Sequence, residues 1–105
     1  MKTIYINTGG RERTIKYGMQ NLYDCLTKHN IWIHNVNFMH NEIQTKHFII
    51  RFVCELTDIR GRMSDEAFGF DESDTKRLLG KHYPNRYTGR AIDYVLECEL
   101  HERDA

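Results

Sequence analysis

Histidine and cysteine are the first residues in this chain to consider for chemistry, because both bind metals and both act in catalysis. The chain has six histidines and three cysteines. His34 and His40 lie six residues apart on one predicted strand, roughly 20 Å at about 3.3 Å per residue. No Cys-x-x-Cys or His-x-x-x-His spacing is present, and such spacings are typical of metal sites. We therefore expect neither a metal nor a cofactor.

The cysteines also give no sign of a nucleophile. Cys25, Cys54 and Cys98 are widely spaced and odd in number, which favours reduced thiols over a disulfide framework. Cys54 and Cys98 fall on predicted apolar faces, which is typical of structural thiols, since reactive ones need an accessible, electropositive site. A Gly-x-Ser-x-Gly motif is absent. We expect no catalytic residues and a protein that is not an enzyme.

Charge is sorted by sign between Ser64 and Arg90. The acidic residues come first and the basic residues follow. The whole chain balances 15 basic against 15 acidic residues, so attraction for a charged partner must come from a local block of this kind.

The basic half of this segment is interleaved with aromatic residues over positions 81–90. That mixture can stack on bases and hold phosphates, and it also suits a protein interface, where Tyr and Arg serve as anchors. A solvated loop with its tyrosines packed on the sheet is the structural alternative. The predicted partner-binding residues are Asp65, Glu66, Phe68, Phe70, Asp71, Glu72, Lys81, Tyr83, Arg86, Tyr87 and Arg90.

A second candidate site lies near the N-terminus. Gly9, Gly10, Arg11 and Arg13 stand between a predicted strand and a predicted helix, where backbone N–H groups and arginines can hold an anion. The segment lacks the Gly-Lys-Ser/Thr ending of a P-loop. A plain turn is the alternative interpretation.

These candidates must be positioned by the surrounding elements. Residues 2–7 predict a strand, and the apolar spacing of 14–28 predicts a helix. Residues 31–39 and 46–57 predict a hairpin with its turn at 41–45. Its register pairs Phe38 with Phe48 and Trp32 with Cys54. The residues expected to share the buried face are Trp32, Val36, Phe38, Ile50 and Phe52, with Ile15, Met19, Leu22 and Leu26 packed over them.

The second half of the chain adds one helix and one strand. Periodicity is lost over 58–71, acidic residues precede basic ones over 71–79 as in a helix, and 92–100 alternates like a half-exposed strand. The order β-α-β-β-α-β predicts a ferredoxin-like α+β fold, with an antiparallel sheet and both helices on one face. We expect a single domain over residues 1–105.

Three short segments resemble the RNA-recognition motif over about half of the chain. They are Ile4-Tyr5-Ile6, Leu22-Tyr23 through Asn30-Ile31, and Lys46-His47-Phe48. The resemblance implies the same fold order and a nucleic-acid-binding sheet. The chain departs from the motif at Ile50, where a second stacking aromatic is expected, and at His47, which replaces a glycine.

The sequence therefore predicts a small protein that binds another macromolecule. No apolar run approaches the roughly 20 residues that cross a bilayer, so we expect a cytoplasmic protein with no membrane contact. The leading hypothesis is a protein-binding inhibitor or accessory factor of the kind that phages and mobile elements encode against host defences. The alternatives are a nucleic-acid-binding domain and a small enzyme without a recognisable motif.

Overall fold

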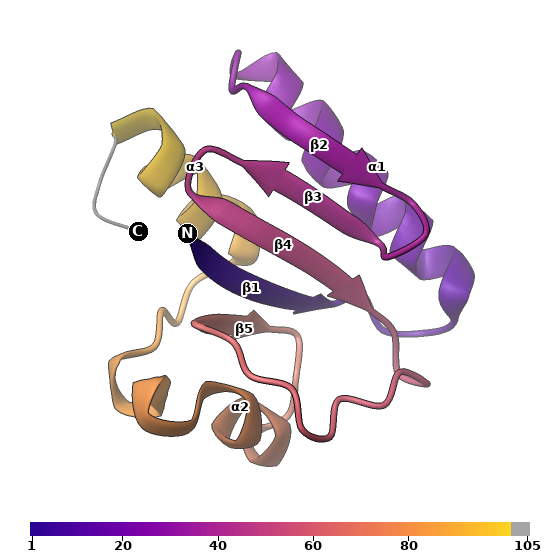
Figure 1. Ribbon diagram of the computed structural model, residues 1–105, viewed down its shortest axis with the longest axis vertical. Helices are drawn as coiled ribbons and strands as arrows, with labels where there is room; N and C mark the ends of the chain where they lie inside the picture. Colours follow the sequence, from indigo (N-terminus) through magenta and orange to yellow (C-terminus); the bar gives the residue numbers. More distant parts are fainter. Residues whose placement is uncertain (102–105) are drawn as a thin grey trace.

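In the computed structural model, which describes residues 1–101, the first strand is an interior strand of a five-stranded sheet. The strands are β1 (Lys2–Asn7), β2 (Ile33–Asn37), β3 (Glu42–Thr45), β4 (Phe48–Val53) and β5 (Glu66–Phe68). β1 pairs in parallel with β4 and β5, whereas β3 is antiparallel to both β2 and β4. The strand order is β2-β3-β4-β1-β5, so the sheet is mixed (Figure 1).

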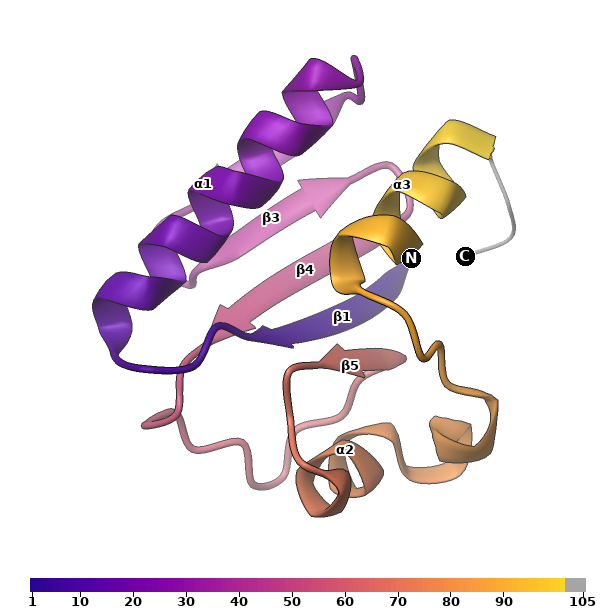
Figure 2. The ribbon, with the colours of Figure 1, turned by 180° about the vertical axis from the view of Figure 1, so that it is seen from behind.

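Helices lie on both sides of this sheet. They are α1 (Glu12–Lys28), α2 (Glu72–Leu79), the 3₁₀ helix η1 (Gly80–Asn85) and α3 (Ala91–His101). Figure 2 shows α1 and α3 in front of one face of the sheet, while α2 lies beside β5. Figure 1 shows the other face, on which β2, β3 and β4 have no helix over them.

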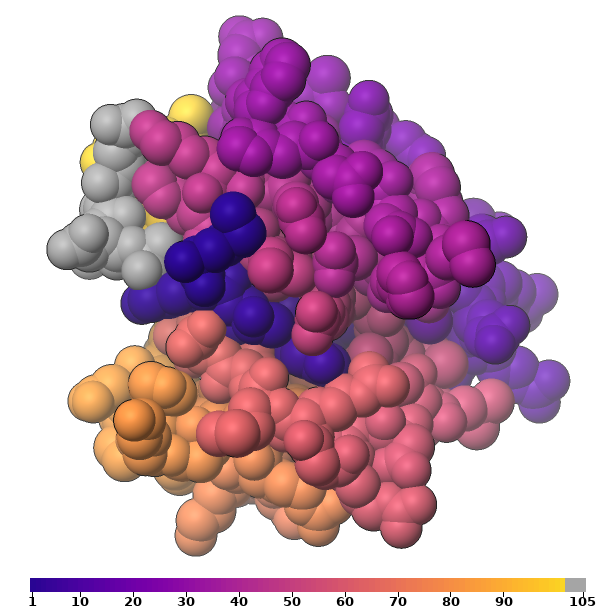
Figure 3. Space-filling model, in the orientation of Figure 1, coloured from indigo at the N-terminus to yellow at the C-terminus, as the bar shows by residue number. Residues whose placement is uncertain are grey.

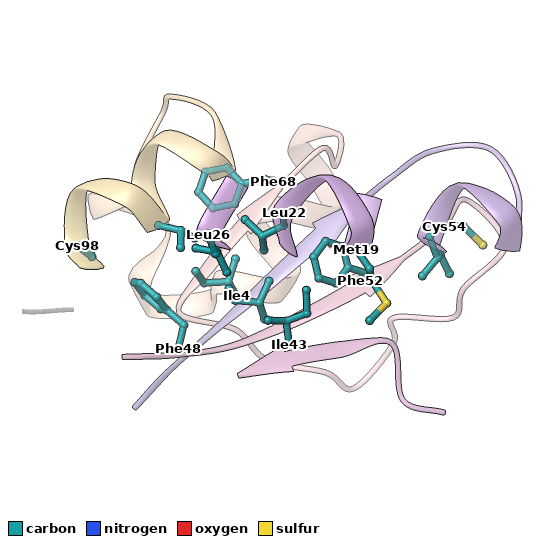
Figure 4. Close-up of a cluster of buried hydrophobic side chains, with 13 residues drawn as sticks. Ile4, Met19, Leu22, Leu26, Ile43, Phe48, Phe52, Cys54, Phe68 and Cys98 are labelled. Atoms are coloured by element: carbon teal, nitrogen blue, oxygen red, sulfur yellow. The ribbon is translucent and has the colours of Figure 1, made fainter. Parts of the chain in front are cut away.

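The main core lies between α1, α3 and the sheet. Its members include Ile4, Ile15, Met19, Leu22, Leu26, Ile43, Phe48, Ile50 and Phe52 (Figure 4). A second, smaller core under α2 contains Tyr5, Val53, Ile59, Ala67, Leu78 and Leu79. Side chains alternate between the two faces of a strand, so Ile4 and Tyr5 enter different cores.

The first helix forms as its apolar spacing predicts. Its buried residues are Ile15, Met19, Leu22 and Leu26. Gly18 lies where α1 passes over the end of β1, and a Cβ there would come within 2.5 Å of the Thr8 methyl carbon. Glycine at position 18 therefore allows α1 to lie close to Thr8, although glycine destabilises a helix by about 1 kcal/mol relative to alanine.

The predicted two-strand hairpin is wrong. Residues Glu42–Thr45 form strand β3 and not a turn, and β4 pairs with β3 and β1. Phe48 therefore faces Lys2 on β1 and does not pair with Phe38. The region is a three-strand meander in which two short turns replace one longer turn.

Two further predictions are also wrong: the strand over residues 92–100 and the irregular stretch over residues 58–71. Residues Ala91–His101 form helix α3, because Val95 and Cys98 are buried with Ala91, Ile92 and Tyr94 packed beside them at helical spacing. The short strand β5 arises inside the stretch predicted to be irregular. The helix at Glu72–Leu79 is confirmed, and Asp71 caps it by accepting the Asp74 N–H at 2.7 Å.

These differences change the fold but not its class. The chain forms a single α+β domain with a mixed sheet and three α-helices, so the antiparallel, ferredoxin-like arrangement is wrong. The predicted burial of Ile50 and Phe52 is confirmed, whereas Trp32 and Phe38 are 75% and 67% exposed. Among residues 1–101, no helix is long and apolar enough to cross a membrane.

Candidate functional site

The sorted charges between Ser64 and Arg90 fold back on one another. Glu72 pairs with Arg86 at 3.3 Å, and Asp65 lies 3.7 Å from His82. The Arg86 guanidinium also stacks over the Tyr83 ring, 4.6 Å from its centroid. One acidic residue of the block, Glu72, is therefore paired with one basic residue, Arg86, within the segment.

Two of the predicted partner-binding residues, Glu66 and Phe68, are buried, and a third, Tyr87, is half-buried against the main core. Phe68 is buried in the main core, and Tyr87 packs on it and on Tyr94, with 4.9 Å between the two tyrosine ring centroids. Glu66 is also buried, and both of its carboxylate oxygens accept the Tyr87 N–H, at 3.0 and 3.2 Å. These side chains hold the 86–90 segment against β5.

The other predicted residues of this segment lie nearer the surface. Phe70 and Tyr83 are half-buried against the smaller core. Exposed side chains are those of Asp71, Glu72, Lys81 and Arg90. Arg90 pairs with Asp93 at 3.0 Å. The structure thus brings the segment together as a packed corner of the fold.

The predicted anion site has the expected backbone. Gly9 and Gly10 both adopt positive φ between β1 and α1, a conformation that favours glycine. Arg11 and Arg13 are exposed and line a shallow groove of about 510 Å³ that also includes Cys54. Anion binding at this groove stays a prediction.

Two of the three cysteine thiols, those of Cys54 and Cys98, are buried. Burial raises the pKa of the Cys98 thiol, which disfavours the thiolate that a nucleophile requires. Cys54 is buried and lies 3.6 Å from the Thr57 hydroxyl. Within residues 1–101, no three His, Cys, Asp or Glu side chains are placed to hold a metal ion.

Sequence reasoning missed an exposed apolar surface at the free edge of β2. Trp32, Phe38 and Met39 are 75%, 67% and 90% exposed, and Tyr23 on α1 lies beside them at 41%. Between α1 and β2 runs a groove of about 310 Å³ lined by Met19, Gln20, Tyr23, Val36 and Phe38. We call Tyr23, Trp32, Val36, Phe38, Met39 and the outer edge of β2 the β2 edge surface.

The backbone of this edge is open to pairing. The Asn41 carbonyl accepts the Phe52 N–H, and hydrogen-bonded pairs alternate along an antiparallel ladder. Glu42 and Gln44 therefore direct their backbone groups toward β2, where they face Asn37 and Asn35. It follows that the N–H and C=O groups of Val36 point outward.

The sequence does contain a signal for this surface, namely a long stretch without charged residues. Thirteen consecutive residues, His29 to Asn41, include no Asp, Glu, Lys or Arg, in a chain that is 29% charged. Interface cores are depleted of charged residues and enriched in Trp, Phe and Met. The apolar residues of this stretch instead predict burial in the protein core, because apolar residues on a strand favour burial.

The uncovered face of the sheet lacks the aromatic platform of an RNA-recognition motif. On its central strands, Tyr5 is buried under α2 and Arg62, while β4 presents Ile49 and Arg51. The Arg51 guanidinium pairs with Glu42 at 3.0 Å. Figure 3 shows this face, with residues of β2 to β4 above those of the α2 region. Two stacked bases would find no pair of exposed aromatic rings at the centre of the sheet.

Comparison with protein-family models, with curated proteins and with solved structures finds no significant match to this chain, so its function must be argued from the geometry of its own surfaces.

Proposed function

We propose that this protein is a non-catalytic protein-binding module and that the bound protein docks on the β2 edge surface. The observation that carries the proposal is the exposure of Trp32 and Phe38 beside an unpaired strand edge. Trp is among the residues that contribute most binding energy at interfaces. An exposed sheet edge supplies main-chain hydrogen bonds to an added strand, with side-chain pockets that give specificity.

The groove beside β2 fits this role. Its lining contains no charged side chain, and Val36 and Phe38 come from the strand side while Met19 and Tyr23 come from the helix side. A volume of about 310 Å³ holds one large apolar side chain of a partner. Proteins that act as monomers usually protect such an edge with Lys, Pro or a covering loop.

Nucleic acid binding is less well supported. Phosphate neutralisation by Lys and Arg dominates affinity for nucleic acids, and the stretch 29–41 carries neither residue. Basic residues in the 81–90 segment are partly engaged, since Arg86 pairs with Glu72 and Arg90 with Asp93. The role of an inhibitor or accessory factor is compatible with a binding module of this size and stays a prediction.

A matched pair of double variants tests the proposal. Trp32→Ser with Phe38→Ser removes the aromatic side chains of the β2 edge surface. Leu56→Ser with Met63→Ser makes the same kind of change at positions that are 75% and 70% exposed elsewhere. Wild type and both variants are immobilised and exposed to nuclease-treated extract of the native host.

We expect wild type and the Leu56/Met63 variant to retain the same protein, and the Trp32/Phe38 variant to lose it. A partner that binds all three equally would contradict the proposed surface. Retention that disappears on nuclease treatment would favour the nucleic-acid alternative.

A further inference from the structure

We propose that the protein occupying the β2 edge surface is a second copy of this chain, paired through antiparallel β2 strands about a two-fold axis near Val36. This inference rests on the proposed function and names its partner. The pairing joins two five-stranded sheets into one continuous sheet. Both copies contribute the same patch, as an isologous dimer requires.

Backbone geometry supplies the pairing groups. Asn35 and Asn37 direct their backbone toward β3, and Val36 directs its N–H and C=O outward. Two copies of Val36 facing each other across a two-fold axis exchange both hydrogen bonds of one antiparallel pair. The β-bulge between Ile33 and Asn35 confines regular pairing to the second half of β2, so the ladder is short and side chains must contribute most of the contact.

Charge favours a second copy over a charged partner. When two identical edges meet, every charged residue near the axis faces its own sign, and like charges placed together are destabilising. The stretch 29–41 avoids that repulsion because it carries no Asp, Glu, Lys or Arg. An edge that recognised a charged protein would instead carry complementary charges.

The two-fold axis also brings the apolar side chains of the two copies together. Val36 faces α1, and a two-fold axis perpendicular to the sheet places both copies of α1 on the same side. The two grooves then meet over the joined β2 strands, and Tyr23 and Phe38 of both copies line one shared apolar space. Trp32 of each copy comes beside the turn after β2 of the other copy.

The available area approaches what a stable dimer needs. Tyr23, Trp32, Phe38 and Met39 leave roughly 500 Å² of side-chain surface accessible per copy, given that an aromatic side chain presents about 150–250 Å². A typical interface buries about 800 Å² per partner. The β2 backbone and the exposed side chains of His34, Asn35 and His40 supply the remainder.

The fluorescence of Trp32 can report on dimer formation in the purified protein. Trp32 is the single tryptophan, so fluorescence excited at a wavelength that tyrosine does not absorb reports on this surface alone. We expect acrylamide quenching of Trp32 to fall as protein concentration rises, while sedimentation equilibrium shows conversion of monomer to dimer with the same midpoint. A chain that remains monomeric with Trp32 fully quenchable at all concentrations overturns the inference.

Two lysine variants locate the interface. Asn35→Lys adds a charge at an exposed position next to the axis, where two copies would repel, and Ser73→Lys adds the same charge at an exposed position on α2. We expect Asn35→Lys to raise the dimer Kd at least tenfold and Ser73→Lys to change it less than twofold. Circular dichroism of both variants should match that of wild type.

The outcomes separate this inference from the proposed function. A dimer that Asn35→Lys leaves intact uses another surface and overturns the inference. If the chain is a monomer and needs Trp32 and Phe38 to retain a different protein, the inferred dimer is overturned and the proposed function is supported. Neither self-association nor dependence on Trp32 and Phe38 would overturn both.

Discussion

At the scale of single residues, Glu66 is a buried carboxyl group whose pKa is raised above its usual value. It lies on β5 at 8% exposure, and burial raises the pKa of its carboxyl group, while the Tyr87 N–H and the charges of Lys2 and His82 lower it in part. The same carboxylate ties the 86–90 segment to the sheet. One side chain thus connects stability with pH.

The raised pKa of Glu66 has a definite consequence for stability. The folded state binds a proton more readily than the unfolded state, so this stabilising contribution is complete below the unfolded pKa and is lost as pH rises through the folded pKa. We expect Glu66→Gln to match wild type in acid and to exceed it in free energy of unfolding at neutral pH. Urea denaturation at several pH values measures the difference, and a difference independent of pH would contradict this account.

The apolar pattern of the sequence predicts one buried face for Phe52 and Trp32, yet the structure separates these two side chains. Phe52 is 3% exposed in the main core. We expect Phe52→Ala to cost about 3–5 kcal/mol, as the loss of a buried aromatic ring usually does. Trp32→Ala should cost about 0.5 kcal/mol or less in dilute protein. Denaturant melts of the two variants test the assignment, and equal losses would refute it.

At the scale of elements, the sequence predicts those whose signals are local. The helix over 12–28 has apolar residues on one face, and the helix at Glu72–Leu79 has its own cap. By contrast, residues 91–101 alternate like a strand and also place Val95 and Cys98 on one helical face. Packing against Phe48 on β4 and Phe68 on β5 decides between these two patterns, and that information lies far away in the sequence.

The same reasoning explains the missed strands and the missed surface. β5 has only three residues, too few for any periodicity to show. Strand β3 lies between two other strands of the meander, so its Ile43 is buried although the segment looks like a polar turn. The exposure of Trp32 could not be predicted, because an edge strand without charged residues has the same composition as an interior strand of the sheet.

The Asp71 cap allows a test at the level of α2. Its side chain accepts the Asp74 N–H, and loss of such a cap costs about 1 kcal/mol. We expect Asp71→Ala to lower the free energy of unfolding by about that amount and Asp71→Asn to lower it by half as much or less, because asparagine caps a helix nearly as well. Similar losses in both variants would mean that charge, and not capping, matters at this position.

Glu99 joins α3 to the turn between β3 and β4. Its carboxylate accepts hydrogen bonds from the buried Thr45 hydroxyl and from the His47 N–H at 3.2 Å. We expect Glu99→Ala to cost about 2–3 kcal/mol, since it leaves two donors without their acceptor, and Glu99→Gln to cost less. Hydrogen exchange should accelerate at residues 45–48 in the alanine variant, and unchanged exchange there would contradict the link.

At the scale of the whole molecule, the position of β1 determines the architecture. Its parallel neighbours β4 and β5 lie on either side, so α1 must cross the sheet to reach β2 at the far edge. The meander then returns toward β1, and α2 and α3 cover opposite faces. Each free edge of the sheet is a short strand, and of the two only β2 is flanked by exposed aromatic residues.

The interior position of β1, between β4 and β5, has a consequence during synthesis. Residues 2–7 emerge from the ribosome before residues 48–53 and 66–68, with which they pair, and contacts this distant in sequence form slowly. A nascent chain that ends before residue 66 has its first strand open on one side and cannot complete the sheet. We expect ribosome-bound chains ending near residue 60 to be degraded rapidly by a pulse of protease, and chains in which the first 101 residues have left the tunnel to resist it. The rate of translation between β1 and β5 would then control how long β1 is exposed to chaperones.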